Sequence, residues 1–212
     1  MKIDHFYYAS EEHKYFLDGQ EIPHITGILQ DSGLVNYTGI PQDILEKKAD
    51  IGRKTHTACE LYDQDNLILE TLHLTLKAYL QGWIQFIEDF KPEFIEIEKP
   101  RYSEKYRFAG KPDRVAIITS NLSIVEIKTS STIERWVGIQ LAGQSILWDE
   151  EKKVKEQIRK RIAVQLLSEP MPKINKQYKV MPFEEATDRA VFMSALTIAN
   201  YKKGGRNGKG ND

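Results

Sequence analysis

The sequence predicts one α/β domain with added helices, and two observations lead to this class. Apolar residues recur at helical spacing in two long segments before residue 90, and short extended segments separated by turn residues follow between 93 and 128. No internal repeat or low-complexity linker divides the 212 residues, which suffice for one substantial core. We therefore expect a single domain over residues 1–203 and a flexible tail rich in glycine and lysine over 204–212.

The first part of the chain is predicted to contain a hairpin and three helices. The hairpin is expected in HFYYASEEHKYFLDGQEIPHITGIL, because aromatic runs flank SEEH and Asp18-Gly19 is a second turn signal. Thr26 and Pro41 stand where a helix cap and a first helical turn are expected, and Lys91-Pro92 ends the last helix. The three helices are expected over about 26–33, 41–60 and 70–90.

The second part is predicted to supply the sheet. Four segments have alternating or continuous apolar character and are separated by turn residues: FIEIEKPRYS, YRFAGK, RVAII and LSIVEIK. A helix is expected over Trp136–Trp148, followed by EEKKVKEQ as a charged continuation or a loop. RIAVQLL and QYKVMPF form a final strand pair, and a last helix runs over about 183–202.

Charged residues occupy positions in two of these strands where apolar side chains are usual. Asp113 begins RVAII, and Glu126 and Lys128 lie at the end of LSIVEIK, on one face because side chains alternate along a strand. A hairpin around Ser120-Asn121 would place Asp113 beside Glu126. The pattern E-x-K occurs five times, but only the copy at Glu126 lies in an apolar strand, so this copy is the candidate for function.

Two adjacent carboxylates repel each other unless a positive charge lies between them. A divalent cation such as Mg²⁺ or Mn²⁺ would supply that charge, since hard oxygen ligands suit both ions. Lys128 beside such an ion could hold an attacking water or neutralise charge on a phosphate. The residues alone thus favour a metal site at this edge of the sheet, against the simpler reading of a charged surface pair.

Several motifs in order resemble the PD-(D/E)xK nuclease superfamily. GKPD, twelve intervening residues and EIK resemble its active-site signature. IGRKTHTACE is similar to the Gly…His…Glu helix of its RecB-like branch, and IEKPRYSEKYRFAGKPD is similar to the strands before the catalytic acid in phage and mitochondrial genome-maintenance exonucleases. EIPHITGIL resembles a P-S-V-T-type segment, and IQLAGQSILW resembles the Gln-x-x-x-Tyr helix. The resemblance covers about residues 21–148 and implies a restriction-endonuclease-like core: a central mixed sheet flanked by helices, with an N-terminal hairpin and added helices.

The resemblance also implies roles for individual residues. The implied metal ligands are Asp113, Glu126, the Ile127 carbonyl, His56 and Glu60, for one or two Mg²⁺ or Mn²⁺ ions. The implied catalytic residues are Asp113, Glu126, Lys128, His56 and Gln140. The residues expected to contact substrate are Gln140, Gln144, Lys111 and Arg114. Gln144 stands where the family usually has Tyr, so its role cannot be carried over from the family.

These assignments imply a metal-dependent DNA exonuclease of phage or bacterial replication or recombination. A non-catalytic DNA-binding or assembly module on the same fold is an alternative, and so is a structure-selective or restriction-type endonuclease. A recombination or single-strand-binding protein is a further possible partner. Polarity, strandedness and oligomeric state cannot be read from the sequence.

The composition limits which partners and which cellular compartment we expect. The net charge is −1, so DNA would have to contact local basic stretches, of which the best are Lys152 to Arg161 and Tyr201 to Lys209. Cys59 is the only cysteine, which excludes an intrachain disulfide and fits a reducing compartment. The N-terminus lacks a signal peptide and no apolar run approaches a membrane span, so we expect a cytoplasmic protein with no membrane partner.

Overall fold

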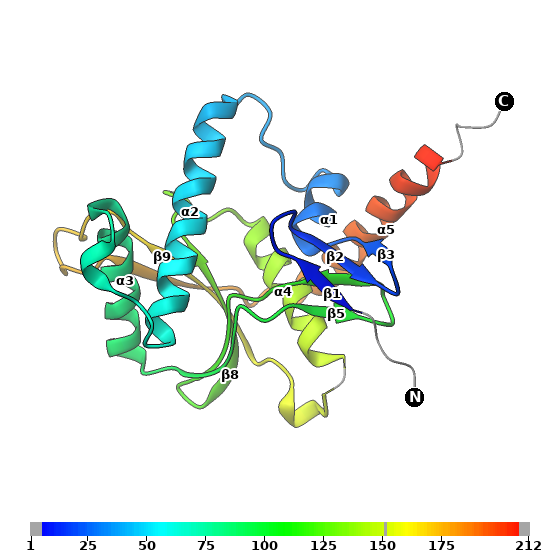
Figure 1. Ribbon diagram of the computed structural model, residues 1–212. Helices are drawn as coiled ribbons and strands as arrows, with labels where there is room; N and C mark the ends of the chain where they lie inside the picture. The colour runs from blue at the N-terminus through cyan, green and yellow to red at the C-terminus, as the bar shows by residue number, and fades with distance from the viewer. Residues whose placement is uncertain (1–5, 151, 208–212) are drawn as a thin grey trace.

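The computed structural model describes residues 6–150 and 152–207, and its centre is a five-stranded mixed sheet (Figure 1). The strand order is β10-β9-β8-β7-β4, in which β8 and β9 are parallel and the other neighbours antiparallel. The strands are β4 (Glu93–Ile97), β7 (Arg114–Ile118), β8 (Asn121–Lys128), β9 (Lys160–Leu166) and β10 (Tyr178–Pro182).

Helices cover both faces of this sheet, which confirms the predicted α/β class with a mixed sheet between helices. They are α1 (Ile25–Ser32), α2 (Gln42–Asp63), α3 (Leu74–Phe90), α4 (Trp136–Asp149) and α5 (Asp188–Asn207). On one face Cys59 of α2 and Trp83 of α3 share a core with Val125. On the other face Leu141 of α4 packs with Ile124. Because successive strand residues point to opposite faces, β8 has apolar side chains on both.

α4 lies between the sheet and a second helical layer. Every residue from Val137 to Asp149 is buried, because α1 and α5 pack on the side of α4 that faces away from the sheet. The helix layers approach closely at Gly143, where an added Cβ would lie 2.6 Å from the ring of Phe192 in α5. α4 is therefore the buried centre of the domain and not a surface helix.

The N-terminal segment forms a three-stranded meander, with one strand more than a simple hairpin. Its strands are β1 (Tyr7–Ala9), β2 (Lys14–Leu17) and β3 (Gln20–Ile22). The second turn falls at the predicted Asp18-Gly19, where both residues have positive φ. The meander packs on a small two-stranded sheet of β5 (Arg101–Ser103) and β6 (Phe108–Gly110), to which Pro23 is joined by a 2.9 Å hydrogen bond from the Ala109 amide.

Element boundaries differ from the prediction at four places. α2 continues to Asp63. The 70–90 helix is divided into a 3₁₀ turn, η1 (Leu69–Thr71), and α3, whose amino end is capped by the His73 side chain. EEKKVKEQ, for which a charged continuation or a loop was expected, is a loop with a 3₁₀ turn, η2 (Val154–Glu156), in the part the structure describes.

The last helix shows the two other differences. α5 begins five residues later than expected, because the amide of Phe183 still donates to Arg161 of β9. The backbone of residues 204–207, which fall in the segment expected as a tail, continues α5, and 208–212 lie outside the described residues. Helix propagation, which adds a hydrogen bond with each residue, outweighs the two glycines there.

Among residues 6–150 and 152–207, no helix combines the length and the apolar character that a bilayer-crossing segment needs.

Candidate active site

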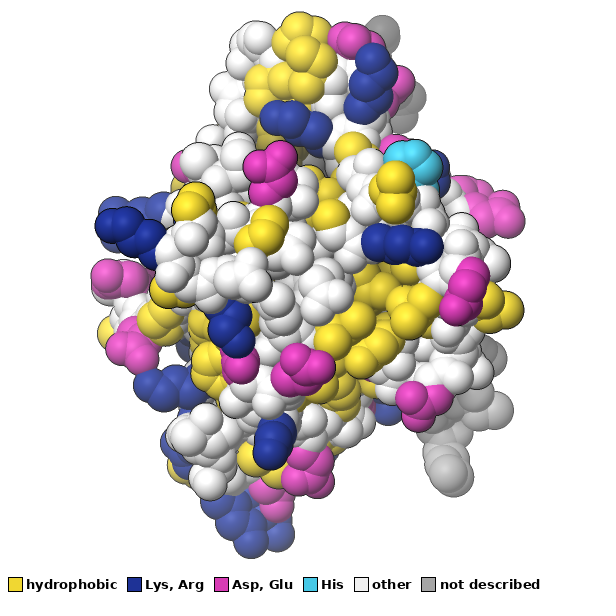
Figure 2. Space-filling model, turned by 90° about the vertical axis from the view of Figure 1, so that its left-hand side faces the viewer, with side chains coloured by type: hydrophobic (Ala, Val, Ile, Leu, Met, Phe, Trp, Pro, Cys, Tyr) yellow, Lys and Arg dark blue, Asp and Glu magenta, His cyan; other side chains and the backbone are white. Residues whose placement is uncertain are grey.

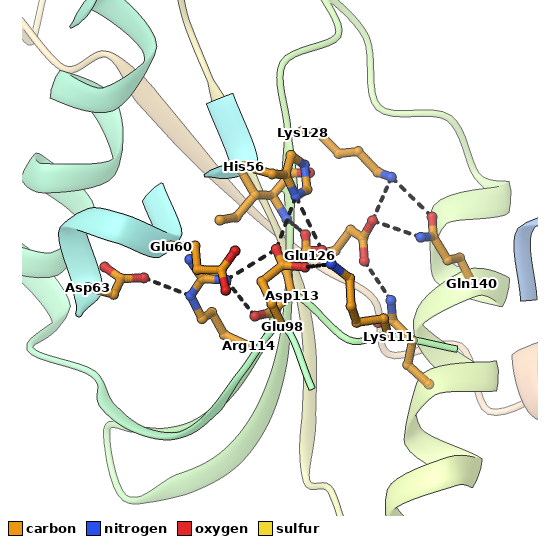
Figure 3. A network of polar contacts seen from close by, with 12 residues as sticks. His56, Glu60, Asp63, Glu98, Lys111, Asp113, Arg114, Glu126, Lys128 and Gln140 are labelled. Atoms are coloured by element: carbon orange, nitrogen blue, oxygen red, sulfur yellow. Dashed lines mark hydrogen bonds and ion pairs between the residues drawn. The ribbon is translucent and has the colours of Figure 1, made fainter. Parts of the chain in front are cut away.

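The acids of the sequence signature meet at the carboxyl end of β8 (Figure 3). Arg114 of β7 is in register with Val125 of β8, so the positions just outside this pair bring Asp113 opposite Glu126. The predicted hairpin between the two strands is thereby confirmed, with its turn at Thr119-Ser120, one residue before the predicted Ser120-Asn121. α2 crosses this end of the sheet on one side and the first half of α4 passes on the other, so each helix can contribute side chains to the same place.

His56 of α2 reaches the end of the sheet at which Asp113 and Glu126 meet. Its Nδ1 lies 3.3 Å from Oδ1 of Asp113 and 3.5 Å from Oε1 of Glu98, and its Nε2 lies 3.1 Å from the carbonyl oxygen of Ile127. Burial lowers the pKa of His56, but the two carboxylates outweigh it and raise the pKa to about 10. Without a bound cation, His56 is therefore the positive partner of both acids at neutral pH.

Asp113 is nearly inaccessible to solvent yet stays ionised. Its Oδ2 accepts a 2.6 Å hydrogen bond from the amide of Ile127. Burial raises the pKa of Asp113, but His56, the Ile127 amide and Lys128 together hold it below its ordinary value. Oδ1 of Asp113 faces His56 and keeps lone pairs with which it could bind a cation.

Glu126 is held by three donors. Nζ of Lys128 and Nε2 of Gln140 both donate to its Oε1 at 2.7 Å, and Nε2 of Gln144 donates to its Oε2 at 2.7 Å. Gln140 and Gln144 are one turn apart on α4, so both reach the same carboxylate. Burial and then Asp113 raise the pKa of Glu126, and the donors oppose this shift. In this structure Gln140 and Gln144 hold the carboxylate of Glu126 in place, whereas the sequence analysis expected both residues to contact the substrate.

Lys128 completes this part of the site. Its Nζ also donates to Oε1 of Gln140 at 3.1 Å and lies 5.4 Å from the ring centre of Trp136. Burial lowers the pKa of Lys128, but Glu126 and Asp113 outweigh it and the pKa is raised. The ammonium is therefore charged at any physiological pH.

Glu98 is a member of the site that the sequence analysis missed. It follows β4 directly, its side chain is 5% exposed, and its Oε2 lies 2.7 Å from Nζ of Lys111. Its amide donates to the carbonyl of Asp113 at 3.0 Å, and its φ of 48° is a left-handed conformation that costs a non-glycine residue about 1–2 kcal/mol. The available signal was topological: β4 pairs antiparallel with β7, so the end of FIEIE lies beside the start of RVAII.

One cluster of potential metal ligands is present among the described residues. It consists of His56, Glu98 and Asp113, whose ligand atoms all lie within 4.8 Å of one another. The carbonyl of Ile127 lies beside it, through its contact with His56. Glu126 is adjacent but lies outside this group. Glu60, labelled in Figure 3, also lies outside this group, and its Oε1 accepts a 3.5 Å hydrogen bond from Nε2 of Gln64.

Arg114, for which substrate contact was predicted, lies in the interior and presents no exposed side-chain surface for that contact. Its side chain is fully buried; it donates to Oδ2 of Asp63 at 2.7 Å and to the carbonyl of Asp113 at 2.6 Å, and lies 3.4 Å from Oε1 of Glu98. Strand alternation turns Arg114 to the face of α2 and α3, opposite to Asp113. Lys111 remains 30% exposed, although it is paired with Glu98.

The two basic stretches lie away from this site. Lys160 is in register with Ser123 at the start of β8, so the 152–161 stretch lies at the opposite end of the strand, roughly 16 Å from Lys128 at the usual rise per residue. Tyr201 to Lys209 lies on the last turns of α5 as far as it is described, and Lys202 there donates to the carbonyl of Asp31. Basic side chains gather at the lower end of the molecule in Figure 2, the end at which the 152–158 loop lies in Figure 1.

Comparison with known proteins adds no family assignment, since neither a family model nor a curated protein matches the chain.

Proposed function

We propose that the protein is a divalent-metal-dependent deoxyribonuclease with a PD-(D/E)xK core that acts on DNA ends. The observation that carries this proposal is the meeting of His56, Glu98 and Asp113 beside the Glu126–Lys128 pair at one edge of the sheet. These side chains lie in or directly beside four separate elements, α2, β4, β7 and β8, whereas a chance surface charge pair would need only one or two.

The donor set fits Mg²⁺ or Mn²⁺. The two carboxylates are the hard oxygen ligands that both ions prefer, the imidazole can join them once it has lost its proton, and the Ile127 carbonyl is adjacent. His56, Glu98 and Asp113 would hold the ion, and a bound divalent cation supplies charge neutralisation and polarisation of a phosphoryl oxygen. A second ion would require Glu126, which stands opposite Asp113 in the β7–β8 pair.

Lys128 is the group best placed to act on the reacting atoms. An ammonium has three N–H donors, and Lys128 uses two of them on Glu126 and Gln140 in the described structure. The third can orient a water or donate to a phosphate oxygen, since the side chain is 19% exposed. Glu126 and Gln140 fix the ammonium, and Gln144 fixes Glu126. Such a site would contact phosphate groups and not base edges, so we infer that cleavage has no sequence specificity.

A non-catalytic DNA-binding or assembly module is the second candidate, and one observation favours it. Each acid already has a cationic partner within the protein: Glu98 has Lys111, Glu126 has Lys128, and Asp113 has the charged His56. A network balanced in this way needs no metal to be stable. The two candidates differ in whether the protein binds Mn²⁺ and cuts DNA.

The test is a cleavage assay on end-labelled single-stranded, double-stranded and closed circular DNA with Mg²⁺, Mn²⁺ or EDTA. Stepwise loss from ends supports an exonuclease, and nicking of circles indicates an endonuclease. Lys128→Ala should lower the rate roughly 100-fold or more, as expected for loss of an electrostatic stabiliser. Lys173→Ala, which alters an exposed lysine of the β9–β10 loop, is the matched control.

Three results would contradict the proposal or its site. DNA binding without cleavage in any metal would select the non-catalytic module. Cleavage that persists in EDTA would contradict the metal dependence. Equal rates for Lys128→Ala and the control would show that Lys128 does not act in the reaction.

A further inference from the structure

A shallow groove of about 700 Å³ lies at the end of the sheet opposite the candidate active site. Its floor is aliphatic: Ile117 of β7 pairs with Leu122 of β8, and Ile95 lies at a bulge in β4. Ile95 is 44% exposed and Ile117 is 37% exposed, both high values for sheet residues of this size. α4 covers the rest of this face of the sheet, and the groove begins where α4 ends.

The wall of the groove is the basic stretch to which the proposed nuclease function assigns no role. Lys152, Lys155 and Arg159 line it, together with a single acid, Glu156. None of the three cations forms an ion pair with a carboxylate in the part of the chain that the structure describes. The groove therefore combines an apolar floor with an excess of positive charge on its rim.

The wall is held in place before any ligand arrives. Nε1 of Trp148 donates to the carbonyl of Glu156 at 2.9 Å, and the amide of Arg159 donates to the carbonyl of Leu122 at 2.8 Å. The guanidinium of Arg159 donates to Val154 across the 3₁₀ turn at 2.8 Å. A preformed wall lowers the entropic cost of binding.

Two features favour a peptide over a nucleic acid as the occupant. Trp148, the one aromatic residue that lines the groove, is 6% exposed and has the cations of Arg101 and Lys152 against its ring, so it offers no free face for stacking a base. β4 is also the edge strand of the five-stranded sheet, with β7 as its one neighbour there. An extended peptide can pair with such an edge while its apolar side chains enter the groove.

We propose that this groove binds an extended peptide segment of a partner protein that carries aliphatic residues and then acidic residues at every second position, so that both kinds of side chain face the groove. The aliphatic side chains would occupy the floor formed by Ile95, Ile117 and Leu122, and the carboxylates would meet Lys152, Lys155 and Arg159. This inference does not depend on the proposed nuclease function, since the two sites lie at opposite ends of β8.

The test is fluorescence anisotropy of the full chain, in EDTA and without DNA, using a short labelled peptide in which Leu and then Asp occupy every second position with Ser between them. Lys155→Glu should weaken binding about fivefold or more, because loss of an exposed ion pair costs up to about fivefold in affinity and the reversed charge adds repulsion. Ile95→Ser should weaken it by a similar factor through loss of apolar contact. Lys173→Glu, the same charge change outside the groove, should leave the affinity unchanged.

Each other outcome overturns the inference. If a labelled oligothymidine binds in the same Lys155-dependent way and displaces the peptide, the surface is a nucleic-acid track. If Lys155→Glu weakens binding but Ile95→Ser does not, the attraction is only electrostatic and the groove is not the site. Absence of saturable peptide binding refutes it directly. DNA cleavage by Lys155→Glu should equal that of the unaltered chain, which separates this result from a failure of the nuclease proposal.

Discussion

Arg114 is expected to be the residue whose loss destabilises the protein most. Its guanidinium joins Asp63 at the end of α2, the carbonyl of Asp113 before β7 and Glu98 after β4. Asp63 is itself fully buried and accepts a second hydrogen bond, 2.8 Å long, from the indole of Trp83. Arg114→Met keeps much of the side-chain volume and removes the charge, so it leaves Asp63 without its cation.

The magnitude follows from this burial. Removing one partner of a buried ion pair costs about 3–5 kcal/mol, because the remaining charge is uncompensated. At 2–4 °C per kcal/mol for a chain of this size, Tm should fall by about 6–20 °C. Burial already raises the pKa of Asp63, and Arg114 opposes the shift. Without Arg114 the folded-state pKa rises further above the unfolded value, so the stability of the variant should fall as pH rises through that pKa and recover at lower pH.

The assay is urea unfolding of single and double variants at several pH values. Asp63→Leu combined with Arg114→Met removes both charges and should be less destabilised than the sum of the single changes by about 2 kcal/mol. Arg114→Lys keeps the charge but cannot reach all the acceptors, so its stability should lie between those of the unaltered chain and Arg114→Met. A loss below about 1 kcal/mol for Arg114→Met, or strict additivity in the double variant, would refute the reasoning.

Three further outcomes are expected. Glu98→Gln should weaken Mn²⁺ binding in calorimetry at least tenfold, whereas Glu60→Gln, one turn beyond the cluster, should change it less than twofold; equal effects would remove Glu98 from the ligand set. Gln144→Leu removes one of the three donors to Glu126 and should cost about 1–3 kcal/mol in urea unfolding, and an unchanged midpoint would show that this hydrogen bond is not needed. Gly82→Ala should destabilise by about 1–3 kcal/mol despite the better helix propensity of Ala, because the new Cβ would lie 2.2 Å from a backbone carbonyl oxygen; a rise in Tm would contradict this.

The strand-level part of the site could be predicted because it is local. Strand alternation and a tight turn suffice to place Asp113 opposite Glu126 and Lys128 on the face of Glu126, and the observed register agrees. The same alternation points Arg114 to the opposite face, which the assignment of Arg114 to substrate contact overlooked.

Glu98 was missed for a different reason. Its place beside Asp113 depends on β4 pairing with β7, and the two strands are separated along the chain by the small β5–β6 sheet. A segment that interrupts two strands gives no turn signal from which their register could be read.

The sequence by itself determined the α/β class, the hairpin of β7 and β8 and the identity of the signature acids, because backbone alternation and turn chemistry act over a few residues. Only the tertiary structure decided which side chains meet those acids. α4 is apolar on nearly every side, so its periodicity does not say that Gln140 and Gln144 face Glu126. His56 reaches Asp113 because α2 crosses the sheet end at one particular place, and packing over the whole domain sets that place.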